Sequence, residues 1–278
     1  IAGVCPECSI MSVKVLDDNG FGDWAVIADG VVWSSDNGAN VISLSLGGGS
    51  SQEYFENAIN YVRSGRPAFC LVDTYRLNPH SKGDDNRDNN EIKKYSDSFV
   101  LLYLGNTSKR RGLETVLKSM PKIVKSISNF KLVIVGSSSF DKELIKTAKN
   151  YNISKYVDFE GWKSEDLFPS YIKAAELGIS PLHSNLHHDT TYANKLFQYM
   201  SLGCPVLCSD VKAQKALLET YNVGLLFRAE NSSDLTEKLF KLYLNSRLRK
   251  KMSKNCINAI ENHLNNEIIS KKLVKYYD

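Results

Sequence analysis

The 278-residue chain predicts an α/β fold, in which a parallel sheet covered by helices follows a shorter α/β fragment. From Phe99 onward short apolar segments alternate with helical patterns, which is typical of parallel sheets buried on both faces. The charge also changes along the chain. Residues 1–66 hold three basic and eight acidic groups, whereas the other 212 residues hold 32 basic and 23 acidic groups. Such asymmetry indicates two pieces of different origin.

Composition excludes several classes of protein. With 42% hydrophobic and 24% charged residues the chain is typical of a soluble globular protein. No apolar run approaches the roughly 20 residues of a membrane span. The basic second piece suits a diphosphate ligand or an anionic membrane surface, and no motif supports nucleic acid. Cys5-Pro6-Glu7-Cys8 is a single CxxC; a zinc site would need further ligands, and a local disulfide is the alternative.

The first piece predicts the order strand, helix, strand, helix. The alternating segment Ser9–Leu16 predicts a strand, and the apolar spacing in Trp24–Ser35 predicts a helix that Asn37-Gly38 ends. Val41–Leu46 is short and apolar, which predicts a buried strand. The serines that follow can cap a helix over residues 50–61.

Segments of this first piece resemble a known family. Gly3-Val4-Cys5-Pro6, Val13-Lys14-Val15-Leu16-Asp17 and the run from Asp36 to Gly48 resemble the middle of a subtilisin-like serine protease, of the peptidase S8 type. That reaction needs an Asp, a His and a Ser. The first histidine of this chain is His80, outside the resemblance, and no Gly-Thr-Ser-Met sequence occurs. We therefore expect no protease activity from this fragment.

The junction is polar. The run from Asn78 to Ser98 predicts a loop or linker because it has almost nothing to bury, although residues 68–72 are apolar enough for one more strand. We therefore expect an incomplete β-α-β-α fragment over residues 1–66, a junction over 67–98 and a larger domain over 99–278.

Six apolar segments define the sheet of the larger domain. The strands we predict are Phe99–Leu104, Lys131–Val135, Val157–Phe159, Leu177–Ser180, Pro205–Cys208 and Gly224–Phe227. Helices fill the intervals, among them Leu113–Ser126, and the chain from Ser233 onward is expected to be helical. Ligands of such sheets bind at the carboxyl ends of the strands, so the functional loops should follow the first four strands.

One polar stretch favours ligand binding. His187 to Thr191 is typical of a loop rich in Asp and Thr, and it leads into an amphipathic helix. Asp and Thr are good N-caps, so the helix N-terminus could present its backbone N–H groups to an anion. Asn194 and Gln198 lie four residues apart and share a helical face. The same pattern also fits a capped surface helix with an ordinary polar face.

The sequence Asn194-Lys195-Leu196-Phe197-Gln198-Tyr199-Met200, followed by Gly203 and Pro205-Val206-Leu207, closely resembles a signature of GT4-type glycosyltransferases. That signature lies in the C-terminal, Rossmann-like, nucleotide-sugar-binding half of the GT-B fold, and residues 72–77 resemble the crossover between its halves. The resemblance implies retaining transfer of a sugar from a UDP- or GDP-sugar to a hydroxyl of a glycan or lipid-linked acceptor. It implies no metal and no further cofactor. It also implies a cytoplasmic location with peripheral membrane contact, whereas subtilases are typically exported.

The loop Gly105–Gly112 holds three consecutive cations, which can screen a diphosphate leaving group. GT4-type enzymes usually carry Gly-Arg, four residues and Lys-Gly here, with both cations on the diphosphate. By that resemblance Arg111 replaces the lysine, but Asn106 replaces the arginine. The site would therefore lack one charge unless Lys109 or Arg110 compensates. A solvated basic loop is the alternative.

The resemblance extends to the other loops. Gly136 lies where the family has Val-Gly-x-Gly, and Gly161-Trp162 matches the turn that contacts the nucleotide base, although Trp162 could equally belong to the core. Many relatives carry two glutamates eight residues apart, at the positions of Thr190 and Gln198. A subgroup has Asp-Thr-Thr there, which implies that Gln198 binds the ribose and that Asp189 to Thr191 line the sugar and phosphates.

The resemblance thus assigns catalytic roles to Arg111, Asp189 and Thr190. It assigns donor binding to Gly105, Asn106, Lys109, Gly112, Gly136, Trp162, His183, Thr191, Asn194, Lys195 and Gln198. Three histidines, His183, His187 and His188, could ligate a metal, but the family needs none.

Other functions stay open at this level. The chain could be an inactive fusion or fragment that at most binds a nucleotide sugar, or the product of a damaged gene or misassembled sequence. A subtilisin-like peptidase remnant without its catalytic triad is a further alternative.

Overall fold

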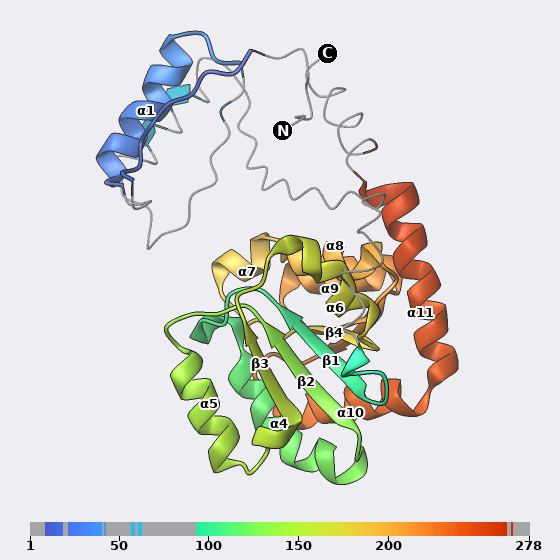
Figure 1. The fold of residues 1–278 in the computed structure, drawn as a ribbon. Coiled ribbons are helices and arrows are strands. Elements are labelled where there is room, and N and C mark those ends of the chain that lie inside the picture. The colour runs from blue at the N-terminus through green and yellow to red at the C-terminus, as the bar shows by residue number, and fades with distance from the viewer. Residues whose placement is uncertain are drawn as a thin grey trace. The chain divides into compact units, whose positions relative to one another are not determined.

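The computed structural model describes residues 9–18, 22–40, 42, 57–58, 61–62, 93–265 and 268. The chain divides into two compact units, Ile1–Arg76 and Leu77–Asp278, and the second contains the sheet (Figure 1). Most of the junction expected over 67–98 lies outside the described residues. The division into 1–66, 67–98 and 99–278 therefore stays a prediction.

The first unit is built on α1 (Trp24–Asp36), which confirms the predicted helix. Asp23 begins the helix by accepting a hydrogen bond from the backbone N–H of Ala25 at 2.7 Å. Gly38, with a φ of +87°, follows its last turn, as expected at a helix end. The apolar face of α1 contributes to a small core of Ala28, Val31, Ile42, Ala58 and Val62.

The strand expected over Ser9–Leu16 is wrong, because these residues make no strand hydrogen bonds. Val15 instead lies against α1, where a Cβ placed on Gly30 would be 2.4 Å from Val15 Cγ1. Alternation alone does not make a strand, which also needs a neighbouring strand to pair with. The strand expected over 41–46 and the helix over 50–61 lie mostly outside the described residues, although residues 57–58 and 61–62 are helical.

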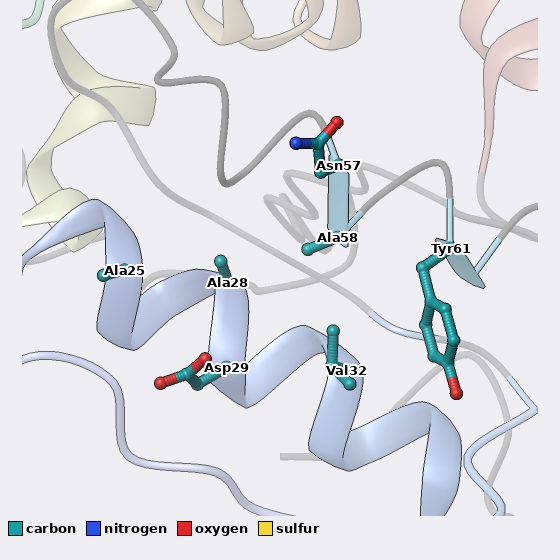
Figure 2. A pocket seen from close by; sticks show the side chains of 7 residues that line it. All are labelled: Ala25, Ala28, Asp29, Val32, Asn57, Ala58 and Tyr61. Carbon is teal, nitrogen blue, oxygen red and sulfur yellow. The ribbon is translucent and has the colours of Figure 1, made fainter.

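An open pocket of the first unit lies between α1 and the residues Asn57, Ala58 and Tyr61 (Figure 2). Ala28 and Val32 line its α1 side, and Ala58 lies opposite. Tyr61 closes one end and donates a hydrogen bond to Asp36 at 3.0 Å. Its lining is mostly small and apolar, so this pocket does not supply the base and nucleophile that proteolysis needs.

The second unit contains the six predicted strands in one sheet. The strands are β1 (Phe99–Leu104), β2 (Phe130–Val135), β3 (Val157–Gly161), β4 (Leu177–Ser180), β5 (Val206–Ser209) and β6 (Gly224–Phe227). Their order is β3-β2-β1-β4-β5-β6, and every neighbouring pair is parallel. The predicted parallel sheet is therefore confirmed.

Helices cover both faces of this sheet (Figure 1). They are α4 (Leu113–Ser126), α5 (Asp141–Asn150), α6 (Phe168–Lys173), α7 (Leu186–Thr190), α8 (Asn194–Ser201), α9 (Lys212–Tyr221), α10 (Ser232–Leu244) and α11 (Ser246–Ala259). Leu101 of β1 packs in one core cluster with α4, α5 and α10. Its neighbour Leu102 packs in the other cluster with α6, α8, α9 and α11. Successive strand residues thus face opposite helix layers, as expected of a sheet that is buried on both sides.

Two expectations about helices need correction. The chain from Ser233 onward is helical as expected in the described residues, but it breaks at Asn245, which ends α10 and whose side chain caps α11 by accepting from Leu248 N at 2.9 Å. The segment expected to be a loop contains α7, because the side chain of Asn185 accepts a hydrogen bond from His188 N. The starts of α7 and α11 both depend on an asparagine side chain that accepts a hydrogen bond from a backbone N–H group of the first turn.

None of the helices in the described part of the chain is both long and apolar enough to cross a membrane.

Candidate functional site

The candidate site lies at the carboxyl ends of β1 and β4. These strands are neighbours, but the chain continues from β1 to β2 and β3 on one side, and from β4 to β5 and β6 on the other. The loops after β1 and β4 therefore leave the sheet in opposite directions. Such a switch point is where open parallel sheets bind ligands.

Backbone hydrogen bonds join the loops around this point. Gly105 N donates to Val135 O at 2.8 Å, and Gly136 N donates to Gly161 O at 2.7 Å. Across the switch point, the N–H of His183 donates to Arg110 O at 3.2 Å. The loops after the first four strands thus form one connected rim. These are the loops in which the sequence predicts the functional residues.

Two glycines make this rim possible. A Cβ on Gly112 would lie 1.7 Å from Pro181 O, and one on Gly136 would lie 2.1 Å from Gly105 O. Both glycines also have positive φ values, +77° and +130°. Only glycine, which has no Cβ, can adopt such a backbone conformation and let another backbone approach so closely.

The loop after β1 is braced by its own polar groups. Asn106 Oδ1 accepts from Ser108 N at 2.9 Å, and Asn106 Nδ2 donates to Ser137 O at 3.4 Å. The Tyr103 hydroxyl donates to Asn106 O at 2.5 Å. Asn106, at the family's arginine position, therefore holds two loops together and brings no charge.

The three cations of this loop differ in burial. Lys109 and Arg110 are exposed, whereas Arg111 is half-buried, and its Nε is buried without a hydrogen-bond partner among the described residues. Burial lowers the pKa of Arg111, and the nearby Arg110 lowers it further. A buried cationic donor without an acceptor is costly unless a ligand supplies one.

Lys195 lies on the other side of the switch point, in the first turn of α8. Its side chain is buried at 7% exposure, and Nζ lies 3.8 Å from the centroid of the Tyr103 ring. Burial lowers its pKa, and the charge of Arg111 adds to that effect. The same Nζ is 3.6 Å from the position that a Cβ on Gly105 would occupy, so the loop after β1 and the first turn of α8 meet here.

The start of α8 differs from the prediction. We expected Asp or Thr to cap this helix, but its N-cap is Ala193, which has no side-chain acceptor. Asp189 instead accepts a hydrogen bond from Lys212 N at 3.1 Å, at the beginning of α9. Thr190 and Thr191 are exposed at the end of α7. The roles assigned to these three residues stay predictions.

The polar residues of α8 divide between surface and interior. Asn194 is partly exposed, and Gln198, one turn later, is buried at 6% exposure. Leu196 and Met200 are fully buried in the core below the helix. The predicted contact of Gln198 with a ribose stays a prediction.

His188, which the sequence offered only as a possible metal ligand, is buried beside the site. It is buried at 2% exposure, and its Nδ1 lies 2.7 Å from His183 O and 2.9 Å from Asn185 Nδ2. Its Nε2 is buried and has no partner in the described structure. Burial lowers the pKa of His188, and Arg111 lowers it further although the His183 carbonyl opposes them, so the imidazole is neutral near pH 7 and offers an acceptor. The spacing Asn185-x-x-His188 could have indicated that this histidine is held in place.

The turn after β3 presents an exposed aromatic residue. Trp162 is 75% exposed beside Gly161, so the alternative that it belongs to the core is wrong. The preceding Glu160 accepts hydrogen bonds from the Tyr95 and Tyr171 hydroxyls, each at 2.9 Å, and pairs with Lys94. Burial alone would raise the pKa of Glu160, but these donors lower it to about 2. This network, which the sequence did not reveal, fixes the base of the turn.

In the described part of the chain no three His, Cys, Asp or Glu side chains are grouped as a metal site.

The family model for Glycosyl transferases group 1 matches residues 84–259, more than half of the chain. The chain belongs to this family. MJ1069 of Methanocaldococcus jannaschii, named an uncharacterized glycosyltransferase, is 26% identical over 187 residues, which cover 66% of this chain and 45% of MJ1069.

Solved structures show the same fold as this group 1 glycosyltransferase. HepE of Anabaena, in complex with UDP, aligns with a TM-score of 0.63 at 14% identity, over 95% of this chain and 70% of that chain. At this identity the likeness concerns the fold alone, which is that of the GT-B glycosyltransferases. The expected fold class is confirmed.

A second family model, that of the Subtilase family, matches residues 1–116. Thermitase of Thermoactinomyces vulgaris is 48% identical over 62 residues, which cover 22% of each chain. A subtilase fragment therefore precedes the glycosyltransferase half, as the sequence indicated. The chain spans less than half the length of thermitase and of MJ1069.

The first prediction concerns Gly112. We expect Gly112→Ala to destabilise the second unit by about 2–4 kcal/mol, because the added Cβ would strain a positive φ and collide with Pro181 O. Gly161→Ala is the matched control, since its φ is also positive, at +68°, but its Cβ would meet nothing within 4 Å. Urea unfolding should give a loss of only about 1–2 kcal/mol for the control. Equal losses of unfolding free energy in the two variants would show that the close approach of Gly112 to Pro181 O does not affect stability.

The second prediction concerns the Glu160 network. The low pKa stabilises the fold above the usual carboxyl pKa of 4.5, and this stability is lost as the pH falls toward 2. We expect Glu160→Gln to lower the free energy of unfolding by about 1–2 kcal/mol at pH 7, after allowance for solvent screening. This loss should become smaller as the pH is lowered from 5 to 3. Denaturant unfolding across this range would measure the difference, with Glu165→Gln, an exposed acid, as control. A difference that does not change with pH would contradict the assignment.

Proposed function

We propose that residues 77–278 bind a nucleoside diphosphate sugar at the switch point, as the donor half of a retaining GT4-type glycosyltransferase. The observation that carries this proposal is the pair Arg111 and Lys195. Arg111 is half-buried, with its Nε fully buried, and Lys195 is buried, and no carboxylate of the described residues forms an ion pair with either. A diphosphate would supply the missing negative charge.

In the proposed reaction, the bond between the sugar anomeric carbon and the diphosphate oxygen breaks, and a bond to the acceptor hydroxyl oxygen forms. Negative charge develops on the departing nucleoside diphosphate, and the acceptor's proton passes to its leaving oxygen. Arg111, with Lys109 at the rim, would stabilise that charge, as would the uncapped N-terminus of α8. Asp189 and Thr190 would line the transferred sugar.

The rest of the donor would follow the rim. The exposed Trp162 could stack on the nucleotide base, and Gln198 would bind the ribose. The shared fold of HepE, which was solved in complex with UDP, supports a nucleotide as part of the ligand. The donor needs no bound metal in this proposal, because protein cations meet the diphosphate. We further propose a glycan or lipid-linked acceptor and a cytoplasmic location with peripheral membrane contact.

A second function is donor binding without transfer. It is favoured by Asn106, whose side chain is engaged in loop hydrogen bonds where the family carries an arginine. Loss of that cation would weaken stabilisation of the leaving group more than it weakens binding. Release of UDP from UDP-glucose in the presence of acceptor, at a rate above that of an Arg111→Ala variant, would exclude this alternative.

The third prediction tests the nucleotide site. UDP or GDP at 100 times its dissociation constant should stabilise the second unit by roughly 2.7 kcal/mol, which raises its melting temperature by about 5–10 °C. Arg111→Ala should weaken that binding about 10- to 100-fold, because it removes charge-assisted hydrogen bonds. Thermal unfolding over a range of nucleotide concentrations measures both effects and identifies the preferred base.

Lys118→Ala is the control for this experiment, because Lys118 is an exposed cation of α4 outside the rim. It should bind nucleotide like the wild type. A cooperative melt that neither nucleotide shifts would refute the proposed site, and an equal shift in Arg111→Ala would remove Arg111 from it.

A further inference from the structure

The environment of Lys195 contains no counter-charge among the described residues. We propose that Lys195 is a proton-coupled ligand of the donor diphosphate, uncharged over Tyr103 in the free protein and protonated when the diphosphate binds. This inference rests on the proposed donor site and adds a pH dependence to it.

Every titratable neighbour of the amine is neutral or positive. On β1, Tyr103 holds its proton because burial raises its pKa, and its hydroxyl donates to Asn106 O. On β5, burial likewise raises the pKa of the Cys208 thiol. From the loop after β1, Arg111 contributes a like charge. On α8 itself, the Tyr199 hydroxyl donates to Leu102 O at 3.0 Å and accepts from Leu104 N at 2.8 Å, so it stays protonated too.

Such surroundings disfavour an ammonium group. A buried charge without a partner is destabilising, and the amine relieves this by releasing its proton, in the direction that burial shifts the pKa of Lys195. The face of the Tyr103 ring offers only a weak cation–π attraction in compensation.

The geometry leaves the amine open to an anion. A Cβ on Gly105 would come 3.6 Å from Nζ, so the glycine leaves space at the amine that any side chain would partly fill. Gly105 begins the loop that carries Arg111, and the charge of Arg111 acts on the amine. An anion between these two cations would restore the charge on Lys195 by direct pairing.

The sign of the pH dependence follows from linkage. Between the low pKa of the free amine and its higher pKa in the complex, binding takes up one proton. The affinity therefore falls as the pH rises, by up to tenfold per pH unit. Outside that interval the affinity is independent of pH.

The fourth prediction is tested by calorimetry of UDP binding from pH 7.5 to 9, in Tris and in HEPES, whose ionisation enthalpies differ. (GDP replaces UDP if it binds more tightly.) In this range the terminal phosphate, with a pKa of about 6, is already ionised. His187 and His188, whose pKa values burial lowers, are already neutral. We expect uptake of nearly one proton by the wild type and a dissociation constant that rises severalfold per pH unit.

Three variants separate this role from a structural one. Lys195→Met should bind at least tenfold more weakly at pH 7.5, with no proton uptake and no pH dependence. Lys195→Arg, which keeps a permanent charge, should restore binding without proton uptake. Lys118→Met on the exposed face of α4 should match the wild type. Proton uptake that persists in Lys195→Met would overturn the inference.

The free protein provides an independent measurement. With lysine labelled at Cε, NMR should show one resonance that is missing in Lys195→Arg and that titrates well below the usual lysine pKa of about 10.4. A resonance that titrates at the usual value would overturn the inference even if UDP binds. Failure of both nucleotides to bind would overturn the donor site and, with it, this role of Lys195.

Discussion

The site depends on the close approach of backbone to backbone at the carboxyl ends of the strands. Pro181 O lies where Gly112 would carry a Cβ, and Gly105 O lies where Gly136 would carry one. These contacts hold the loop after β1 between the loops after β2 and β4. The position of Arg111 relative to Lys195 is therefore set by main-chain packing and not by a salt bridge. Since main-chain packing does not depend on charge, the two cations can stay close together without an acid between them.

The buried charged groups of the second unit differ in whether they have partners of opposite charge or hydrogen-bond partners. Glu160 is surrounded by donors from the segment before β1, from α6 and from Lys163, so its carboxylate is fully matched. Arg111 Nε has no hydrogen-bond partner in the described structure, and Lys195 Nζ lies over the ring of Tyr103 with no carboxylate paired to it among the described residues. The fold satisfies one charge thoroughly and leaves two others unmatched, both at the switch point, which is consistent with the anionic donor proposed for this site.

The sequence predicted the sheet well because its strands are short apolar runs buried on both faces, and β1, β4 and β6 have the predicted bounds. It failed at Ser9–Leu16, where the alternating pattern makes no strand hydrogen bonds. It also missed α7 and the break at Asn245, because both depend on one side chain that caps a helix. Within the site, family resemblance indicated Arg111 and Lys195, but their burial follows from tertiary packing. The network of Glu160 and the burial of His188 were missed because their partners are distant in sequence or are backbone carbonyls.

The different depths of the two cations follow from their chemistry. A guanidinium keeps its proton at any ordinary pH, so it cannot relieve the cost of burial by becoming neutral. Arg111 accordingly stays half-buried, whereas Lys195 is buried to 7% exposure. An amine can release its proton, and this allows it to occupy a site beside a permanent cation. A pair made of one permanent and one removable charge can thus be tolerated in the free fold and still present two positive charges to a diphosphate.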